Sequence, residues 1–190
     1  MYPRDLGDRL RARLDQRPDV VPAAGDRLAA VLIPVIDADD PLLVFTQRTD
    51  ELPRHAGEIS FPGGMADPVD RTLQETALRE TREELGIGSS AIDVLGATDP
   101  VHTFVSSILV VPFVGWLSER PILHPDPGEI AEVLEFPISA LMEAETSVEW
   151  ERPDGHVYRG SAFELDGRTI WGATGAMLHA FLGHLRELTT

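Results

Sequence analysis

Three glutamates lie close together in the segment Arg79-Glu80-Thr81-Arg82-Glu83-Glu84. Each residue of an α-helix turns by about 100°, so a helix would place Glu80, Glu83 and Glu84 on one arc about 100° wide. Neighbouring carboxylates repel one another unless a cation lies between them, and such oxygen ligands favour Mg²⁺ or Mn²⁺. The segment therefore predicts a metal site with these three glutamates as ligands. The alternative is a solvated helix face with local Arg–Glu pairs.

The residues around this segment favour a helix. The chain from Arg71 to Leu85 has strong helix formers and contains neither Gly nor Pro. Gly86 is expected to end the helix as its C-cap, and either Asp70 or Thr72 to cap its start. Arg79 precedes Glu83 by four residues, a spacing that lets it pair with that carboxylate or orient it. An adjoining arc is expected to face the core, with Glu84 at its border; it holds Leu73, Ala77, Leu78, Thr81 and Leu85.

The chain from Gly64 to Ile87 resembles the signature box of the Nudix hydrolase family. Gly64 and five residues lead to Asp70, and eight more lead to Arg79-Glu80-Thr81-Arg82-Glu83-Glu84-Leu85-Gly86-Ile87. Three features depart from the family's box. Asp70 stands for Glu, the spacer has one extra residue, and Thr81 stands where an aliphatic residue is usual.

A narrower resemblance points to the coenzyme A pyrophosphatases within that family. Phe45-Thr46-Gln47-Arg48-Thr49, then Gly57, then Phe61-Pro62-Gly63-Gly64 are similar to their signature, and the extra spacer residue is usual there. Thr49 replaces a usual Ser, and Pro53 stands where the signature has Arg, with Arg54 one step away. The stretch Phe104-Val105-Ser106-Ser107 also differs from the usual segment, whereas Ile170-Trp171-Gly172-Ala173-Thr174 fits.

These resemblances imply divalent-metal-dependent hydrolysis of a pyrophosphate bond in a small nucleotide. The expected substrate is coenzyme A or an acyl-CoA, giving 3′,5′-ADP and 4′-phosphopantetheine. The metal ions, Mg²⁺ or Mn²⁺, would be held by Glu80, Glu83 and Glu84. The implied catalytic residues are Glu129, Glu83 and Arg79, with Glu132 or a box glutamate as alternative general bases. The implied substrate-binding residues are Arg48, Arg54, Gly63 and Gly64.

The pattern of the whole chain predicts an α/β fold: a Nudix-type α/β/α sandwich with a mixed β-sheet between helices. Residues 1–190 are expected to form one domain, with 1–27 as a helical extension and connector and 64–87 as the box. Strands, one of them interrupted by Pro34, and loops separate four predicted helices. The helices are expected at 6–14, 71–85, 139–144 and 173–188; the strands at 29–36, 42–47, 92–101, 106–116, 130–136, 147–151, 157–163 and 169–171; and long loops at 48–60 and 121–128.

Composition excludes several kinds of chemistry. The 190 residues carry 32 acidic and 16 basic side chains, a formal charge of −16, and every base is Arg. Without Lys there is neither a Schiff base nor a P-loop lysine, and without Cys neither a thiol nucleophile nor a cysteine-ligated metal. The charge argues against binding to nucleic acid or anionic membrane, because both reward clustered bases. No targeting segment is visible, so the expected location is the cytoplasm.

Three alternatives remain open at this stage. The substrate could instead be ADP-ribose, an NAD-type dinucleotide, a dinucleoside polyphosphate or an oxidised nucleotide. The domain could be a non-catalytic nucleotide sensor, although all three box carboxylates are present. The third alternative is an acidic α/β scaffold without a metal site. Homodimers are frequent in the family, which leaves a homodimer open, and Trp171 is expected to anchor the core.

Overall fold

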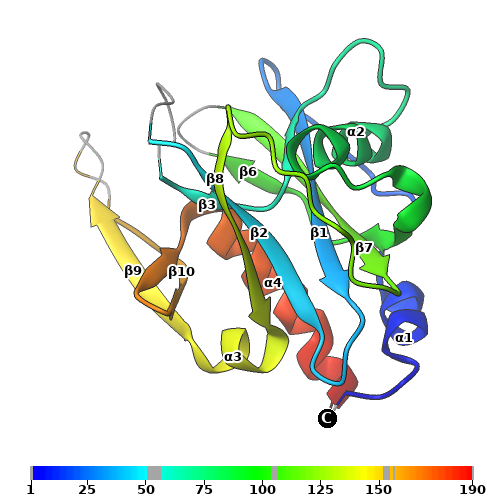
Figure 1. Cartoon of the computed structure of the whole chain (residues 1–190). Coiled ribbons are helices and arrows are strands. Elements are labelled where there is room, and N and C mark those ends of the chain that lie inside the picture. Colours follow the sequence, from blue (N-terminus) through cyan, green and yellow to red (C-terminus); the bar gives the residue numbers. More distant parts are fainter. Residues whose placement is uncertain (1, 51–56, 104–106, 152–154, 156, 190) are drawn as a thin grey trace.

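The centre of the molecule is an eight-stranded sheet (Figure 1). The computed structural model describes residues 2–50, 57–103, 107–151, 155 and 157–189. The sheet has the order β3-β2-β1-β7-β5, while β4 also pairs with β1, β6 with β7 and β8 with β2. Only β1 and β7 run parallel, so the predicted mixed sheet is confirmed. The strands are β1 (Arg27–Ile36), β2 (Leu42–Arg48), β3 (Ile59–Ser60), β4 (Gly63–Met65), β5 (Asp93–Ala97), β6 (Val101–Thr103), β7 (Ile108–Leu117) and β8 (Ile130–Pro137).

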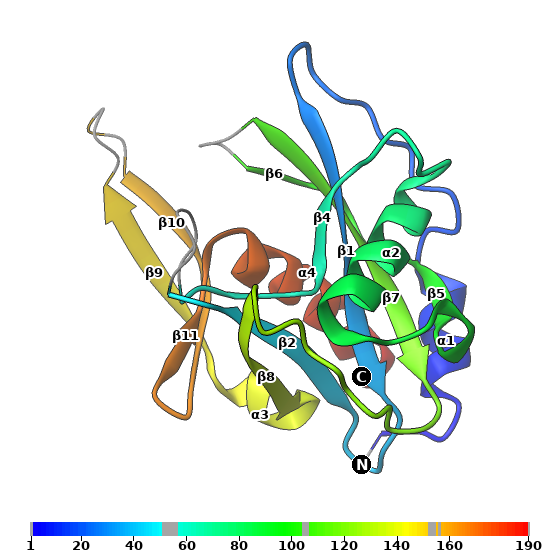
Figure 2. The same cartoon turned by 45° about the horizontal axis from the view of Figure 1, so that its top comes forward.

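Helices cover both faces of this sheet (Figure 2). The α2 helix (Leu73–Leu85) packs on one face, whereas α1 (Leu6–Arg13) and α4 (Gly172–Thr189) lie on the other. Successive side chains of β1 enter two different hydrophobic clusters, Ile33 the one beneath α1 and α4 and Leu32 the one beneath α2. A strand buried on both faces is apolar throughout, which explains the continuous hydrophobic run. The predicted α/β/α sandwich is confirmed.

Pro34 does not interrupt β1, contrary to the sequence prediction. Backbone N–H groups alternate between the two edges of a strand. The N–H of Leu32 donates to the carbonyl of Pro62 at 2.9 Å, so the nitrogen of Pro34 faces that same edge. There the partner strand is β4 before this position and β2 after it. Proline therefore occupies the one place on this edge where no sheet partner needs its missing N–H.

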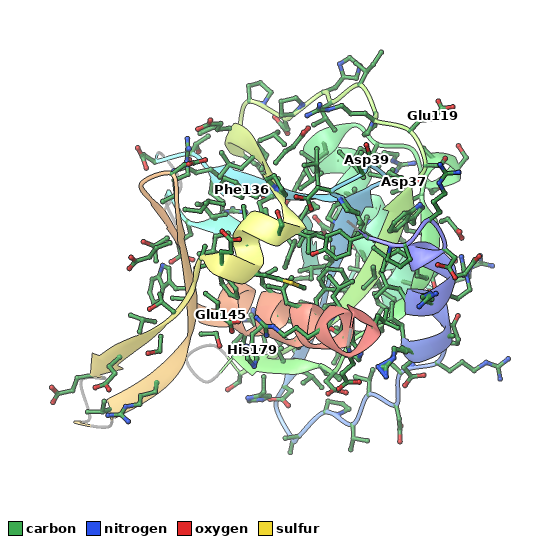
Figure 3. The ribbon with its side chains drawn as sticks, turned by 90° about the horizontal axis from the view of Figure 1, so that it is seen from below. Asp37, Asp39, Glu119, Phe136, Glu145 and His179 are labelled. Atoms are coloured by element: carbon green, nitrogen blue, oxygen red, sulfur yellow. The ribbon has the colours of Figure 1, made fainter. Side chains whose placement is uncertain are left out.

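Three predicted strands near the C-terminus are confirmed, but they form a separate antiparallel sheet in the order β11-β10-β9. These are β9 (Glu145–Glu151), β10 (Val157–Leu165) and β11 (Arg168–Ile170). Phe163 of β10 packs with α4, and Glu145 accepts a hydrogen bond from Arg186 of that helix. Glu145 also pairs with His179 of α4 (Figure 3). Trp171 is 45% exposed, so its prediction as a core anchor was wrong; the side chain that enters the core is Ile170.

The sequence prediction was least accurate for the short strands. The expected loop at 48–60 contains β3, and β4 at 63–65 was not predicted. The predicted strand at 92–101 is divided into β5 and β6. The helix predicted at 139–144 is present as α3 (Ile138–Glu143). A single turn, η1 (Ser89–Ala91), follows α2.

No helix in the described part of the chain is long and apolar enough to cross a membrane.

Both ends of α2 use recognisable caps. Thr72, not Asp70, is the N-cap, and its side chain accepts from the N–H of Glu75 at 3.1 Å. Gly86 is the C-cap with φ of 73°, and its N–H donates to the carbonyl of Arg82 at 2.9 Å. A Cβ at this position would lie 2.8 Å from the Cβ of His124. The cap thus lets the loop before β8 pack against the end of α2.

Replacing this cap tests its importance. We expect Gly86→Ala to lower the free energy of unfolding by about 1–2 kcal/mol, because a side chain disfavours positive φ and would contact His124. Urea unfolding measures the change. Gly183→Ala is the matched control: nothing lies within 4 Å of its added Cβ, in the interior of α4, so stability should rise by up to about 1 kcal/mol. Equal effects of the two substitutions would contradict the assignment of Gly86 as a cap.

Candidate active site

The three box glutamates differ sharply in their exposure. Glu84 is 5% exposed, and the side chains of Glu80 and Glu83 are 19% and 53% exposed. Glu84 therefore lies deeper than the border position predicted for it. The backbone N–H of Gly63 hydrogen-bonds to its carboxylate, while its Oε2 is buried and has no hydrogen-bond partner among the described residues. A buried carboxylate oxygen in that state suits a cation or a donor from a ligand.

Two glycines bring β4 close to this cluster. A Cβ on Gly64 would lie 2.5 Å from the Cδ of Glu80, and a Cβ on Gly63 would lie 2.4 Å from the carbonyl oxygen of Ala30. Contacts that short do not occur with real side chains. The glycines let β4 pair with β1 while the Glu80 carboxylate rests directly on the strand backbone.

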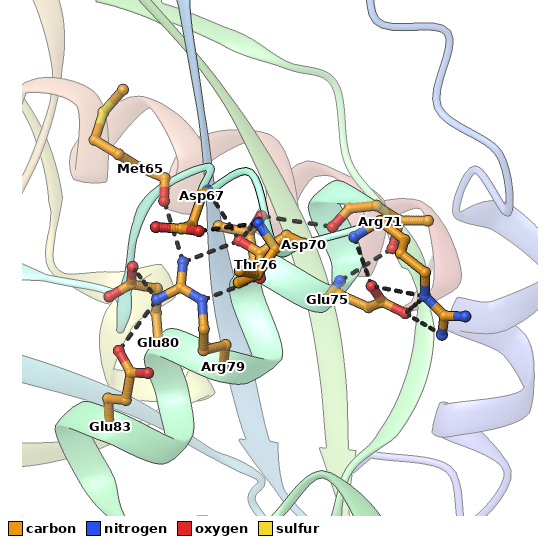
Figure 4. A network of polar contacts seen from close by, with 11 residues as sticks. Met65, Asp67, Asp70, Arg71, Glu75, Thr76, Arg79, Glu80 and Glu83 are labelled. Carbon is orange, nitrogen blue, oxygen red and sulfur yellow. Dashed lines mark hydrogen bonds and ion pairs between the residues drawn. The ribbon is translucent and has the colours of Figure 1, made fainter.

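Arg79 joins the box glutamates to the loop in front of the helix (Figure 4). Its Nε and Nη2 donate to the two carboxylate oxygens of Asp70, each at 3.0 Å. Its Nη1 donates to Glu80 at 2.8 Å and to Glu83 at 3.1 Å, and Nη2 also donates to the carbonyl of Met65 at 3.2 Å. All five N–H donors of the guanidinium are used. The predicted pairing of Arg79 with Glu83 is present, within a larger network.

Asp70 is the anchor of this network. Its side chain is 5% exposed, and hydrogen bonds from Arg79 hold the pKa of its carboxyl well below the usual range. The backbone N–H of Asp67 at 3.0 Å and the hydroxyl of Thr76 at 2.9 Å also donate to it. The aspartate that replaces the usual glutamate of the box is thus fully engaged with the helix. Sequence reasoning found neither Thr76 nor the Met65 carbonyl, because a backbone acceptor leaves no sequence signal and Thr76 resembles a core residue.

Burial and neighbouring negative charges disfavour the ionised forms of Glu80 and Glu84. Burial raises the pKa of Glu84 to about 8, and the charge of Glu80 adds to the effect, while Arg48 and Gly63 oppose it. Burial also raises the pKa of Glu80, as do the charges of Glu83 and Glu129, against the opposing contacts of Arg79. A cation between these groups would relieve both the repulsion and the loss of hydration.

The structure brings Glu129 and Arg48 to this cluster. The charge of Glu129 acts on both Glu80 and Glu84, and the charge of Arg48 acts on Glu84. The carbonyl of Glu129 accepts from the N–H of Thr49 at 2.9 Å, which ties the loop before β8 to the end of β2. The Nε of Arg48 is buried and has no hydrogen-bond partner among the described residues.

Other predicted residues lie elsewhere. Glu132 accepts a hydrogen bond from Arg168 of β11 at 2.6 Å, so its carboxylate is already paired. Arg54 and Pro53 lie outside the described residues, as does the segment 104–106. Two surface hollows of about 380 and 470 Å³ both adjoin Trp116 and share no lining residue with the carboxylate cluster. Among the described residues, the site is therefore recognised here by its charged groups.

The donor set suits a divalent cation, although the side chains are not arranged around one. In the described ranges, no group of three or more His, Cys, Asp or Glu side chains is placed to hold a metal ion. The Nη1 of Arg79 bridges Glu80 and Glu83 instead. Carboxylate oxygens, one of them buried without a partner, are nevertheless the ligands that Mg²⁺ and Mn²⁺ prefer.

Solved structures show the same fold. The chain superposes on the Nudix domain of NrtR from Shewanella oneidensis, crystallised with ADP ribose, with a TM-score of 0.56 and 15% identity; 90% of this chain and 95% of that chain are covered. A MutT protein from Methanosarcina mazei also gives a TM-score of 0.56 at 15% identity, over 88% of this chain and 100% of that one. At such low identity the likeness concerns the fold alone.

Sequence comparison adds closer relatives. The family described as "NUDIX domain" matches residues 26–160, which is more than half of the chain. A protein of Pectobacterium atrosepticum named "Uncharacterized Nudix hydrolase NudL" is 35% identical over 173 residues, covering 89% of this chain and 88% of the relative. A protein of the same name from Yersinia enterocolitica is 37% identical over 157 residues, covering 82% and 80%. The match of the family model and these relatives show that the chain belongs to the Nudix hydrolase family.

Proposed function

We propose that this Nudix pyrophosphohydrolase cleaves the pyrophosphate bond of coenzyme A or an acyl-CoA, giving 3′,5′-ADP and 4′-phosphopantetheine. The observation that carries the chemistry is the buried carboxylate oxygen of Glu84, which has no hydrogen-bond partner among the described residues. The charges of Glu80 and Glu129 act on Glu84, and that of Glu83 acts on Glu80. The substrate is inferred from the signature between Phe45 and Gly64 and from Arg48, which that signature contains and which lies beside Glu84. Relatives named NudL are consistent with this subgroup.

Glu80, Glu83 and Glu84 are the proposed ligands of Mg²⁺ or Mn²⁺. When bound, the metal neutralises charge on the diphosphate and lowers the pKa of the attacking water. The three side chains contribute differently: Glu84 is held by Gly63 in the interior, Glu80 rests on Gly64, and Glu83 is exposed enough to move. Arg79 acts as a positioning residue, because its donors are all used within the protein.

Glu129 is the proposed general base. The attacking water forms a new P–O bond while the bond from phosphorus to the bridging oxygen breaks, and its proton passes to a carboxylate. Glu129 is exposed and close enough for its charge to act on Glu80 and Glu84. Glu132 is paired with Arg168, which makes it the weaker candidate.

Arg48 is the proposed phosphate ligand inside the site. Arginine binds phosphate through paired N–H donors, and Arg48 has a buried Nε without a partner in the described structure. Arg54 is assigned to the substrate by resemblance alone. Gly63 and Gly64 are proposed to serve the substrate indirectly, by leaving room for the carboxylates.

We further infer that residues 1–190 form one domain. Leu6, Leu10 and Leu14 of the N-terminal extension enter the same hydrophobic cluster as Leu178 and Phe181 of α4. The extension is therefore part of the core and not a separate unit. A small nucleotide is the expected ligand of this domain, and the net charge of −16 disfavours nucleic acid.

Incubation with coenzyme A and Mg²⁺ or Mn²⁺, followed by mass spectrometry, tests the substrate. We expect 3′,5′-ADP and 4′-phosphopantetheine, and we expect Glu83→Gln to abolish them while the circular dichroism spectrum is unchanged. Glu75→Gln is the control, because Glu75 lies on the same helix as Glu83 but pairs with Arg71, which precedes the helix and lies outside the cluster. Cleavage of ADP-ribose, NAD or dinucleoside polyphosphates in preference to coenzyme A would overturn the substrate, and full activity of Glu83→Gln would overturn the metal assignment.

Substitution of Glu129 tests the base. Glu129→Gln should lower kcat by about 10²–10⁴ with KM nearly unchanged, because the amide cannot accept the proton but keeps the shape of the side chain. Steady-state kinetics measures both constants. The comparison is Glu132→Gln, for which no comparable loss of kcat is expected. The reverse pattern would assign the base to Glu132.

The pH dependence of stability tests the anchor. Asp70 has a pKa lowered from its ordinary value of 3.8, so its carboxylate stabilises the folded state above that pH, and this contribution is lost as the pH falls further. Asp70→Asn should cost about 1–3 kcal/mol at pH 5–8 and progressively less below pH 4. Asp67→Asn is the control, since that carboxylate is exposed. A cost for Asp70→Asn that does not change with pH, measured by urea unfolding, would contradict this role.

A further inference from the structure

Thr76 is a buried hydroxyl that the family box does not explain. It lies in the second turn of α2 and is 0% exposed. Its Oγ1 lies 2.9 Å from Oδ2 of Asp70 and 3.5 Å from the carbonyl oxygen of Thr72. The shorter distance and the charge of the acceptor direct the hydroxyl proton to Asp70. A buried side chain of the helix thus donates to a carboxylate that belongs to the preceding loop.

The position of Thr76 relative to Arg79 gives this contact its meaning. Residues three apart on a helix share a face, so α2 presents the hydroxyl and the guanidinium to the same carboxylate. Arg79 forms a bidentate pair with Asp70, and Thr76 adds a third side-chain hydrogen bond from the previous turn. Three contacts from two turns of one rigid helix fix the plane of the carboxylate more tightly than the arginine does alone (Figure 4).

The orientation of Asp70 is passed on through Arg79. The guanidinium is planar, so fixing Nε and Nη2 on Asp70 also fixes the direction of Nη1. That nitrogen is the one that holds Glu80 and Glu83. Any rotation of the Asp70 carboxylate would therefore move Glu80 and Glu83, which are hydrogen-bonded to Nη1 of Arg79.

We propose that Thr76 is a positioning residue of the metal site: its hydroxyl fixes Asp70, and Asp70 fixes Glu80 and Glu83 through Arg79. The inference rests on the proposed function, in which these glutamates hold the metal. Thr76 touches neither metal nor substrate. It acts indirectly, through Asp70 and Arg79, on the carboxylates proposed to bind the metal.

Two substitutions separate the hydroxyl from the packing of Thr76. Thr76→Val keeps the shape and removes the hydroxyl, whereas Thr76→Ser keeps the hydroxyl and removes a buried methyl group. Thr76→Val should weaken Mn²⁺ binding and lower kcat about 3- to 10-fold, less than the 10–100-fold typical of groups that hydrogen-bond directly to a metal-ligating side chain. Thr76→Ser should retain both Mn²⁺ affinity and kcat and lower Tm, because it leaves a small void.

Thr81 supplies the matched control on the same helix. It is also 0% exposed, and its Oγ1 donates to the carbonyl of Ala77 at 2.7 Å, within the helix and outside the Arg79 network. Thr81→Val should leave Mn²⁺ affinity and kcat unchanged. Loss of any buried hydroxyl on α2 is thereby distinguished from loss of the one that reaches Asp70.

Mn²⁺ titration by calorimetry and steady-state kinetics provide the main readouts. The nuclear magnetic resonance signal of the Arg79 Nε–H provides one that needs neither metal nor substrate. We expect slow hydrogen exchange of that proton in the wild type, in Thr76→Ser and in Thr81→Val, and faster exchange in Thr76→Val. If Thr76→Val does not fold, Thr76→Ala compared with Thr76→Ser isolates the hydroxyl in the same way.

The outcomes distinguish this inference from the function on which it rests. Absence of metal-dependent cleavage by the wild type, with any substrate, overturns the proposed function, and the Arg79 signal still tests Thr76. If the wild type is active, the inference is overturned when Thr76→Val matches Thr81→Val in affinity and exchange. It is also overturned when Thr76→Ser loses as much affinity as Thr76→Val, because packing alone would then explain the effect.

Discussion

The five hydrogen bonds of Arg79 are the interaction on which the rest of the site depends. One guanidinium joins β4, the loop that follows it and two turns of α2, through Met65, Asp70, Glu80 and Glu83. Taking a cation out of water is costly unless its donors are satisfied, and here every donor has an acceptor. The same contacts leave the cluster anionic, because three carboxylates share one positive charge. This imbalance is the physical reason for expecting divalent cations there.

The helix that carries these residues serves the core and the site together. Ala77 and Leu85 are buried against the sheet, and Glu84, on the same helix, is almost as buried as they are. The close approach of β4, which only glycine at 63 and 64 permits, supplies the backbone N–H that Glu84 needs in that position. Packing therefore places a carboxylate where water cannot hydrate it fully, and the chemistry of the site follows from that placement.

What could be predicted from sequence was mostly local. The extent of α2, its Gly86 cap and the common face of the box glutamates follow from spacing within one helix. The mixed sheet and its two helical layers followed from apolar runs and from resemblance. Contacts between distant segments did not follow. Pro34 continues a strand because the neighbouring strand changes at that position, and Trp171 is exposed whereas the adjacent Ile170 is buried.

Within the site too, contacts set by spacing along one helix were predicted, and contacts with other segments were not. The pairing of Arg79 with Glu83 could be predicted because the two residues are four apart on one helix. The ion pair of Arg79 with Asp70 depends instead on the conformation of the loop before the helix. Asp70 is one methylene shorter than the glutamate usual in the box, and the spacer after it is one residue longer. The backbone N–H of Asp67 and the hydroxyl of Thr76 also donate hydrogen bonds to the Asp70 carboxylate. A pattern of residue types does not reveal these contacts.

An acidic protein that acts on a polyanion must divide its few positive charges between two tasks. Arg79 has used all its donors inside the protein and has none left for a phosphate. Arg48 lies in the same cluster, beside Glu84, and retains a buried Nε without a partner in the described structure. The first arginine therefore shapes the anionic site, and the second is the proposed phosphate ligand. Lysine, a point charge without a rigid fork, would serve neither task as well, in keeping with a chain whose sixteen bases are all arginine.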